Sequence, residues 1–235
     1  MFNEVKVDQF KTGQSFVLYQ ASVSKKPSRL GKFLMVIGLL GLTGYLSPML
    51  AAEANYRLSP APSLVEAVNL SVTETSKTTA APQNFSLAIP KIHLSTPVVA
   101  NVDPYNEKEY EVSLKKGVAQ AKGTAFPGQR ETIYIFGHSS SFLWDNNPYG
   151  AAFYLLDKLN KDDQIVLTYN DKIYSYKVSD KKIIEGRDFS FLTLENTEKL
   201  VLQTCWPPST NWKRLVVIAD PVESMAVSDI NTNSL

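Results

Sequence analysis

The feature that most limits how this chain can fold is a run of twenty residues, 33–52, that contains no charged side chain. As a helix rising about 1.5 Å per residue, the run would reach about 30 Å, the thickness of the hydrocarbon core of a bilayer. Its three glycines and one proline are tolerated better in membrane helices than in soluble ones. We therefore expect residues 33–52 to form a transmembrane signal-anchor.

The charges before this run predict its orientation. Residues 1–32 carry six basic and two acidic side chains, and the positive-inside rule keeps such a segment in the cytoplasm. A cleaved signal peptide is the alternative, because Ala52-Glu-Ala54 has the small-x-small form of a cleavage site. Its apolar core would be too long and its leading segment too extended, so we expect an uncleaved, single-pass anchor with the remaining chain extracytoplasmic.

The rest of the chain divides into three parts. Residues 53–84 predict a flexible extracytoplasmic linker, because they are rich in Ser, Thr, Ala and Pro and have few large apolar side chains. Residues 85–222 have the length of one domain with a single core, and residues 223–235 form a polar C-terminal tail. With 24 basic and 23 acidic residues, the formal net charge is +1, which predicts no nucleic-acid partner.

Short apolar segments separated by turn residues predict a mainly β domain. The expected strands are residues 85–89, 97–100, 131–136, 164–169, 172–184, 200–204 and 215–219, and Asn170-Asp171 is expected to form a two-residue hairpin turn. Helical spacing of apolar residues is limited to 106–114 and 151–159. We expect a closed barrel of seven or eight strands with two short helices, preceded by one transmembrane helix.

Cys205 is the only cysteine of the chain and ends the apolar run 200–205, and Arg214 follows nine residues later. In an oxidising extracytoplasmic location, cysteines usually pair as disulfides, so a single thiol requires another explanation. One explanation is a buried, inert cysteine, which is a common state of this residue. The other is a nucleophile for covalent acyl transfer, which needs a histidine partner.

Two histidines could be that partner. His138 follows an apolar strand and Gly137 and precedes three serines, so it is expected at a strand end that opens into a polar loop, where catalytic groups are often carried. The alternative for His138 is a structural role in which it satisfies backbone groups. His93 lies in an extended stretch bounded by Pro90 and Pro97, and we interpret it as an exposed strand residue.

Taken together, these segments resemble the sortases, the membrane-anchored cysteine transpeptidases of the bacterial cell surface. The matching stretches are Ile-Pro-Lys-Ile at 89–92, Gly-Val-Ala-Gln at 117–120, Gly-Thr-Ala-Phe-Pro-Gly at 123–128, Phe-Gly-His at 136–138, Tyr-Ser-Tyr-Lys-Val at 174–178, Leu-Gln-Thr-Cys at 202–205 and Lys-Arg-Leu-Val-Val at 213–217. Their order, with a Thr-Cys strand end and a downstream arginine, makes the likeness specific. The resemblance implies a closed barrel of sortase type, located at the bacterial membrane, with the triad His138, Cys205 and Arg214 in a groove where two strands end.

The chemistry of these three residue types agrees with that implication. Only the thiolate attacks a peptide carbonyl well, and nearby imidazolium and guanidinium groups favour the ionised sulfur. His138 would protonate the departing amine and later take a proton from the incoming one. Arg214 offers a rigid fork of donors to a developing oxyanion or an extended substrate. Candidate substrate-binding residues are Thr204, which could instead hold the strand end, Trp206, Trp212 and Ser139.

The resemblance also implies a substrate and partners. The enzyme would cleave an LPXTG-like sorting motif near the C-terminus of a surface protein, hold the acyl part as a thioester and pass it to an amine acceptor, such as a peptidoglycan precursor. Asp103-Pro-Tyr105 follows the first expected strand and the tail is polar, which favours protein anchoring over pilin polymerisation. A thiol hydrolase and a tethered binding domain with an incidental cysteine remain alternatives. We expect no cofactor or metal; calcium is possible in some sortases, but scattered acidic residues such as Glu185, Asp188, Glu195 and Glu198 do not support it.

Overall fold

The computed structural model describes residues 28–63, 66, 85–140, 147–186, 197–222 and 225–226. The chain forms two compact units, Met1–Thr43 and Gly44–Leu235. Most of the predicted linker, both ends of the chain and the segment 141–146 after His138 lie outside the described residues. The predictions that fall on those segments therefore stay predictions.

The uncharged run belongs to a longer helix, α1 (Arg29–Leu58). Among the described residues, no single straight helix is long and apolar enough to span a bilayer. The segments Arg29–Gly44 and Met49–Leu58 meet that test of length and composition only together, bent by 59° at the break between them. The break contains Pro48, which has no backbone N–H to continue the helical ladder. The structure therefore does not support the single transmembrane helix predicted at 33–52.

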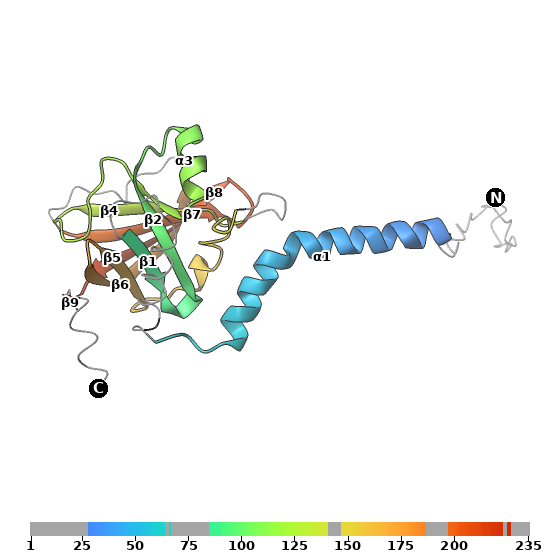
Figure 1. The fold of residues 1–235 in the computed structure, drawn as a ribbon, viewed down its shortest axis with the longest axis horizontal. Helices are drawn as coiled ribbons and strands as arrows, with labels where there is room; N and C mark the ends of the chain where they lie inside the picture. The colour runs from blue at the N-terminus through green and yellow to red at the C-terminus, as the bar shows by residue number, and fades with distance from the viewer. Residues whose placement is uncertain are drawn as a thin grey trace, which may run out of the picture. The chain divides into compact units, whose positions relative to one another are not determined.

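Eight strands close into the predicted barrel (Figure 1). The strands are β1 (Phe85–Ile89), β2 (Leu94–Val102), β3 (Val118–Ala121), β4 (Thr132–Phe136), β5 (Gln164–Tyr169), β6 (Lys172–Glu185), β7 (Lys199–Trp206) and β8 (Lys213–Pro221), with the two-residue β9 (Met225–Ala226) added to β6. They pair in the order β5-β1-β2-β3-β4-β7-β8-β6, and pairing of β6 with β5 closes the ring. The hairpin turn predicted between β5 and β6 is confirmed, since Asn170 and Asp171 both have positive φ, 49° and 59°.

The helices agree with the sequence only in part. The predicted helix at 106–114 is confirmed as α3 (Glu107–Leu114), which begins at the capping residue Asn106. The predicted helix at 151–159 is wrong, because this segment forms turns and one 3₁₀ turn, η2 (Leu156–Lys158). Its apolar residues all enter the barrel core: Phe153, Leu155, Leu156 and Leu159. Packing of consecutive side chains into that core overrides their helical spacing.

Alternate residues of the strands face opposite sides of the barrel wall. On β7, Leu200 and Leu202 belong to the interior core, whereas Val201 belongs to a second cluster with Tyr134 of β4 and Val216 of β8. This second cluster therefore covers the outer side of the wall formed by β4, β7 and β8. The distinction between the two faces determines which residues can share the active site.

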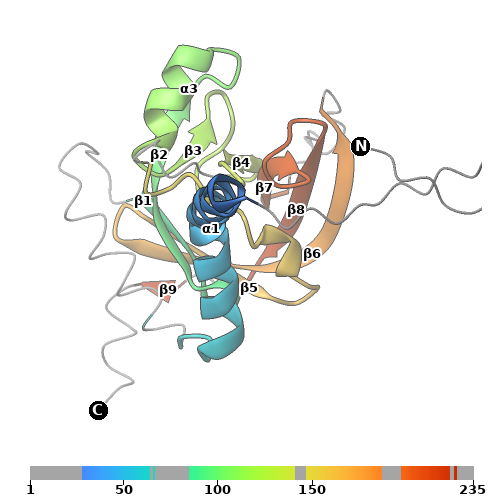
Figure 2. The same ribbon diagram turned by 90° about the vertical axis from the view of Figure 1, so that its right-hand side faces the viewer.

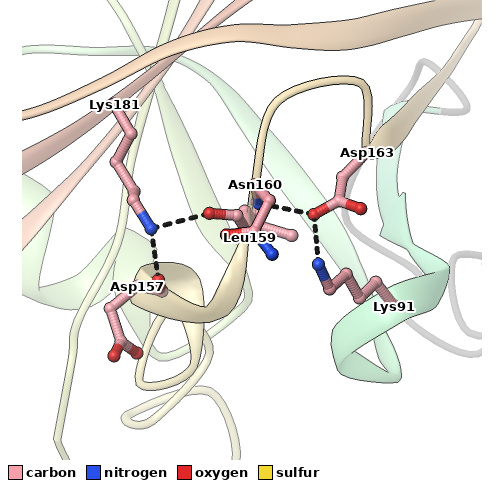
Figure 3. Close-up of polar contacts among 6 residues, drawn as sticks. All are labelled: Lys91, Asp157, Leu159, Asn160, Asp163 and Lys181. Atoms are coloured by element: carbon pink, nitrogen blue, oxygen red, sulfur yellow. Dashed lines mark hydrogen bonds and ion pairs between the residues drawn. The ribbon is translucent and has the colours of Figure 1, made fainter.

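The chain between η2 and β5 is fixed by two lysines (Figure 3). Lys181 of β6 donates from Nζ to the carbonyls of Asp157 (2.5 Å) and Leu159 (2.7 Å). Asp163 Oδ2 accepts from the backbone N–H of Asn160 (2.5 Å) and pairs with Lys91 Nζ at 2.6 Å. Lys91 lies in the 3₁₀ turn η1 (Pro90–Ile92). These contacts hold in place the segment whose Phe153 contacts the backbone of His138.

Candidate active site

Cys205 lies near the end of β7, directly opposite Arg214 of β8. The two strands are antiparallel and lie side by side in both ribbon views (Figures 1 and 2). Residues directly opposite in such a pair point to the same face, with Cβ atoms about 4.5–5.5 Å apart. The thiol is free and half-buried, and the Arg214 side chain is also half-buried. The fold therefore brings together the thiol and the guanidinium that the sequence paired.

Alternation places this pair on the outer face of the barrel wall. Leu202 and Leu215 belong to the interior core, and Cys205 and Arg214 are an odd number of residues from them along β7 and β8. The same face carries Tyr134, Phe136 and Val216. The site is thus built on the outside of the sheet, near the ends of β4 and β7, and the barrel interior remains a packed core.

His138 reaches this face by extending β4. Strands β4 and β7 are parallel with Phe136 opposite Gln203, and the Gly137 N–H donates to the Gln203 carbonyl at 3.1 Å. His138 and Cys205 each come two residues after this matched pair, so the ladder brings them level with one another. Sequence reasoning placed His138 at a strand end, and the structure confirms that position.

Two further hydrogen bonds hold the backbone at His138. The Thr204 hydroxyl donates to the Gly137 carbonyl at 2.8 Å, and the Phe153 N–H donates to the His138 carbonyl at 2.9 Å. A Cβ on Gly137 would lie 3.0 Å from side-chain atoms of both Phe153 and Val118, tighter than ordinary packing. Glycine therefore allows the close approach that these hydrogen bonds require.

An open groove of about 580 Å³ lies over the end of the sheet. It is lined by the polar residues after β4 and by the loop between β7 and β8: His138, Ser139, Ser140, Cys205, Ser209, Thr210, Asn211 and Trp212. The Trp212 side chain is 73% exposed, whereas Ser139 is only 3% exposed. Of the four predicted substrate-binding residues, Ser139 and Trp212 thus lie at the groove.

The other two, Thr204 and Trp206, lie on the opposite face of β7 from Cys205. Thr204 is buried and makes the hydrogen bond to Gly137 described above, and Trp206 packs partly against the interior core. These positions favour the alternative in which Thr204 holds the strand end. Arg214 donates from Nη1 to the carbonyls of Asn211 (3.1 Å) and Lys213 (3.0 Å), so it also fixes the loop that carries Trp212.

The structure adds residues that sequence reasoning missed. Glu111 of α3 places its Oε2 3.8 Å from His138 Nε2. Burial, followed by the charges of Glu107 and Glu111 and of Cys205, raises the pKa of Tyr110 of α3, and Arg214 opposes this shift. Burial raises the pKa of Tyr134, again against Arg214. Tyr134 could have been assigned to this face by alternation along β4, but nothing in the sequence indicates that α3 lies next to His138.

The acidic residues considered for calcium have other contacts where the structure describes them. Glu185 pairs with Lys213 at 3.4 Å, and Glu198 accepts from the Tyr176 hydroxyl at 2.6 Å and the Gly128 N–H at 3.2 Å. Asp188 and Glu195 lie outside the described residues. Within the described ranges, no three His, Cys, Asp or Glu side chains gather as metal ligands would.

The arrangement can carry out acyl transfer in chemical terms. A thiol, an imidazole and a guanidinium reach one face at the end of two parallel strands, next to a groove that is open enough for an extended peptide. Over residues 87–222, the sequence matches the family model described as the sortase domain. The chain belongs to the sortase family.

Known sortases are similar to this chain in sequence and in fold. Sortase D of Bacillus subtilis (strain 168) is 30% identical over 122 residues, which are 52% of this chain and 53% of that protein. This sortase therefore spans about half the length of that curated relative. Among solved structures, a pilus-related sortase C of Group B Streptococcus is 25% identical with a TM-score of 0.51, covering 59% of this chain and 66% of that one. Sortase A of Corynebacterium diphtheriae is 25% identical with a TM-score of 0.52, covering 63% of each chain.

Proposed function

We propose that this sortase is a cysteine transpeptidase with Cys205 as nucleophile, His138 as general acid and base, and Arg214 as the cation that stabilises developing negative charge. The observation that carries the proposal is the convergence of the three residues. His138 and Cys205 line one groove, and Arg214 is the direct cross-strand partner of Cys205. His138 follows β4, Cys205 lies on β7 and Arg214 lies on β8. A rigid sheet of this kind holds catalytic groups in fixed positions.

The reaction has two acyl transfers. The Cys205 thiolate attacks the scissile carbonyl carbon, the carbon–nitrogen bond breaks, and the leaving amine takes a proton from the His138 imidazolium. The acyl part stays on sulfur as a thioester. An incoming amine then attacks this thioester and gives a proton to His138, and the Cys205 thiolate leaves. Arg214 stabilises the oxyanion of each tetrahedral intermediate.

The substrate class follows from the family. We propose an LPXTG-like sorting motif near the C-terminus of a surface protein as the acyl donor and an amine of the cell surface, such as a peptidoglycan precursor, as the acceptor. An extended peptide suits the open groove and its exposed Trp212. Anchoring to the bacterial membrane through α1, with the barrel outside, belongs to the same proposal and is supported by the uncharged run and the preceding basic residues.

Pilin polymerisation is the second candidate. The likeness to a pilus-related sortase C favours it, but sortase A of Corynebacterium diphtheriae is equally identical in sequence. Asp103-Pro-Tyr105 forms a turn between β2 and α3, in which Asp103 Oδ1 accepts from the Tyr105 N–H at 2.9 Å. The motif therefore belongs to the barrel's own connection ahead of α3, which favours the anchoring role.

Amine capture tests transpeptidation against the other activities. The purified full chain is incubated with a panel of LPXTG-like peptides, with and without triglycine, and the products are separated by mass. We expect a peptide joined to triglycine whose yield rises with triglycine concentration. A product that is only the free acid at all triglycine concentrations identifies a hydrolase. Absence of any cleavage across the panel contradicts both activities and supports a binding domain.

A further inference from the structure

Helix α3 lies beside His138, although it contributes none of the residues that line the groove. It packs on β2 and β3 (Figure 2), through Leu114 with Val102 and Ala119. The Tyr110 ring meets Phe136 of β4 edge-on, with centroids 6.3 Å apart. Phe136 is two residues before His138, so this contact holds α3 next to the catalytic face.

The position of the helix is fixed at its N-terminus as well. The Asn106 side chain accepts from the Glu109 N–H, and Glu109 accepts at Oε1 from the Asp103 N–H at 3.1 Å. These are the contacts of a capped helix start. The backbone of the next turn of α3, which carries Glu111, is therefore held in a defined position.

Glu111 on that turn faces the catalytic histidine. Its Oε2 lies 3.8 Å from His138 Nε2, and the two side chains are 47% and 28% exposed. This distance is too long for a hydrogen bond, and the contact is an ion pair only when His138 is protonated. It attracts only the protonated imidazole, so its strength changes as the proton of His138 moves. Other ionisable groups at or near this face are Tyr110 and Glu107 of α3, Tyr134 of β4, Cys205 of β7 and Arg214 of β8.

We propose that Glu111 is a positioning residue that fixes the direction of the His138 ring at the groove. The proposal rests on the proposed function, in which the His138 imidazolium donates the proton that releases the first amine. No bond is made or broken at Glu111. Its carboxylate attracts the His138 ring in the steps in which that ring carries the proton, and this attraction is absent when His138 is neutral. Arg214 lies on the other side of Cys205 from His138, and it provides a separate cation for the thiolate.

The test compares two charge-removing variants of the same helix in the full chain. Glu111→Gln keeps the size of the side chain and removes the charge facing His138. Glu107→Gln is the matched control, because it removes an equal charge one turn earlier, near Tyr110 but outside the ion pair. Glu109 is avoided because it takes part in the helix cap. Both variants are expected to fold, since Glu107 and Glu111 lie on the exposed side of α3.

The first readout does not depend on activity. The chain has only two histidines, so ¹⁵N spectra of the imidazoles at pH 7 can be assigned with a His93→Gln variant. We expect Glu111→Gln to shift the His138 signals and to leave those of His93 unchanged, and Glu107→Gln to shift neither. Unchanged His138 signals in Glu111→Gln overturn the inference, whatever the activity of the chain.

The second readout is kinetic. An exposed ion pair stabilises by a small amount, so we expect Glu111→Gln to lower kcat about two- to fivefold with little change in KM. The difference from the unchanged chain should vanish near 1 M salt, where the Debye length is about 3 Å. A kcat for Glu111→Gln equal to that of Glu107→Gln at low salt contradicts the inference. Moved His138 signals in a chain without transpeptidation contradict the proposed function and leave the ion pair established.

Discussion

Cys205 and Arg214 are direct cross-strand partners, one residue pair before the loop that joins β7 to β8. Their shared face is the outer side of the barrel wall, and the Arg214 guanidinium is held there by the carbonyls of Asn211 and Lys213. The Arg214 side chain thus places a cation beside the sulfur and also fixes the loop beside the groove. Under the proposed function, Arg214 therefore serves both the chemistry and the shape of the site.

Replacement of Arg214 by lysine tests this double role. Lysine keeps the charge, but it lacks the planar guanidinium group. That group can bond two carbonyls and face the sulfur at the same time. Since removal of one oxyanion donor costs about 10²–10³ in rate, we expect Arg214→Lys to lower kcat about 100-fold in the amine-capture assay. The control is Lys213→Gln, which removes a neighbouring exposed cation paired with Glu185. Near-normal turnover by Arg214→Lys would show that charge alone is sufficient.

Thr204 connects the strand of the nucleophile to the backbone of the histidine. Thr204→Val keeps the volume and removes the hydrogen bond to the Gly137 carbonyl, so we expect about 1 kcal/mol less stability in urea unfolding. We also expect a lower kcat, because Gly137 positions His138. Thr204→Ser retains the hydroxyl and is expected to keep both properties close to those of the unchanged chain. Equal behaviour of the valine and serine variants contradicts this structural role.

The buried Tyr176 predicts how stability depends on alkaline pH. Burial, followed by its hydrogen bond to Glu198 and the charge of Glu198, raises the pKa of Tyr176 above its ordinary value of about 10. The folded chain holds this proton more tightly than the unfolded chain. The contribution of Tyr176 to stability is therefore complete below about pH 10 and decreases as the pH rises further, by up to about 1.4 kcal/mol per pH unit.

Urea unfolding at several pH values measures this effect. Tyr176→Phe is expected to be less stable at pH 7, because a hydrogen bond is lost, and to lose stability less steeply above pH 10. Tyr105→Phe, at a side chain that is 83% exposed, is the control and should keep the steep loss. Parallel curves for Tyr176→Phe and the unchanged chain would exclude Tyr176 as the source.

Much of this architecture could be predicted from the sequence, because short alternating segments and the Asn170-Asp171 turn carry local information. β3 was missed since its Val-Ala-Gln-Ala sequence has only one β-branched residue. The segment 151–159 was misassigned because burial in the barrel, which depends on distant strands, decides its conformation. Residues 33–52 were expected to form one transmembrane helix, and the 59° break was not predicted, although Pro48 was noted as an interruption of the run.

Prediction of the site from the sequence is limited in the same way. The placement of His138, Cys205 and Arg214 follows from strand ends and pairing, and alternation along β7 could already have separated Thr204 and Trp206 from the face of Cys205. Glu111 and Tyr110 could not have been found in this way. They reach the site only because α3 packs on β2 and β3 and meets Phe136 of β4, which are contacts between elements distant in sequence.

The most direct test of the account is the mass of the acyl-enzyme. The full chain is incubated with an LPXTG-like peptide without an added amine, quenched in acid and digested, and the peptide that contains Cys205 is weighed. We predict an added mass equal to the acyl half of the motif, located on Cys205, absent from Cys205→Ala and discharged by triglycine. Cleavage of the motif by Cys205→Ala at the rate of the unchanged chain would contradict the account.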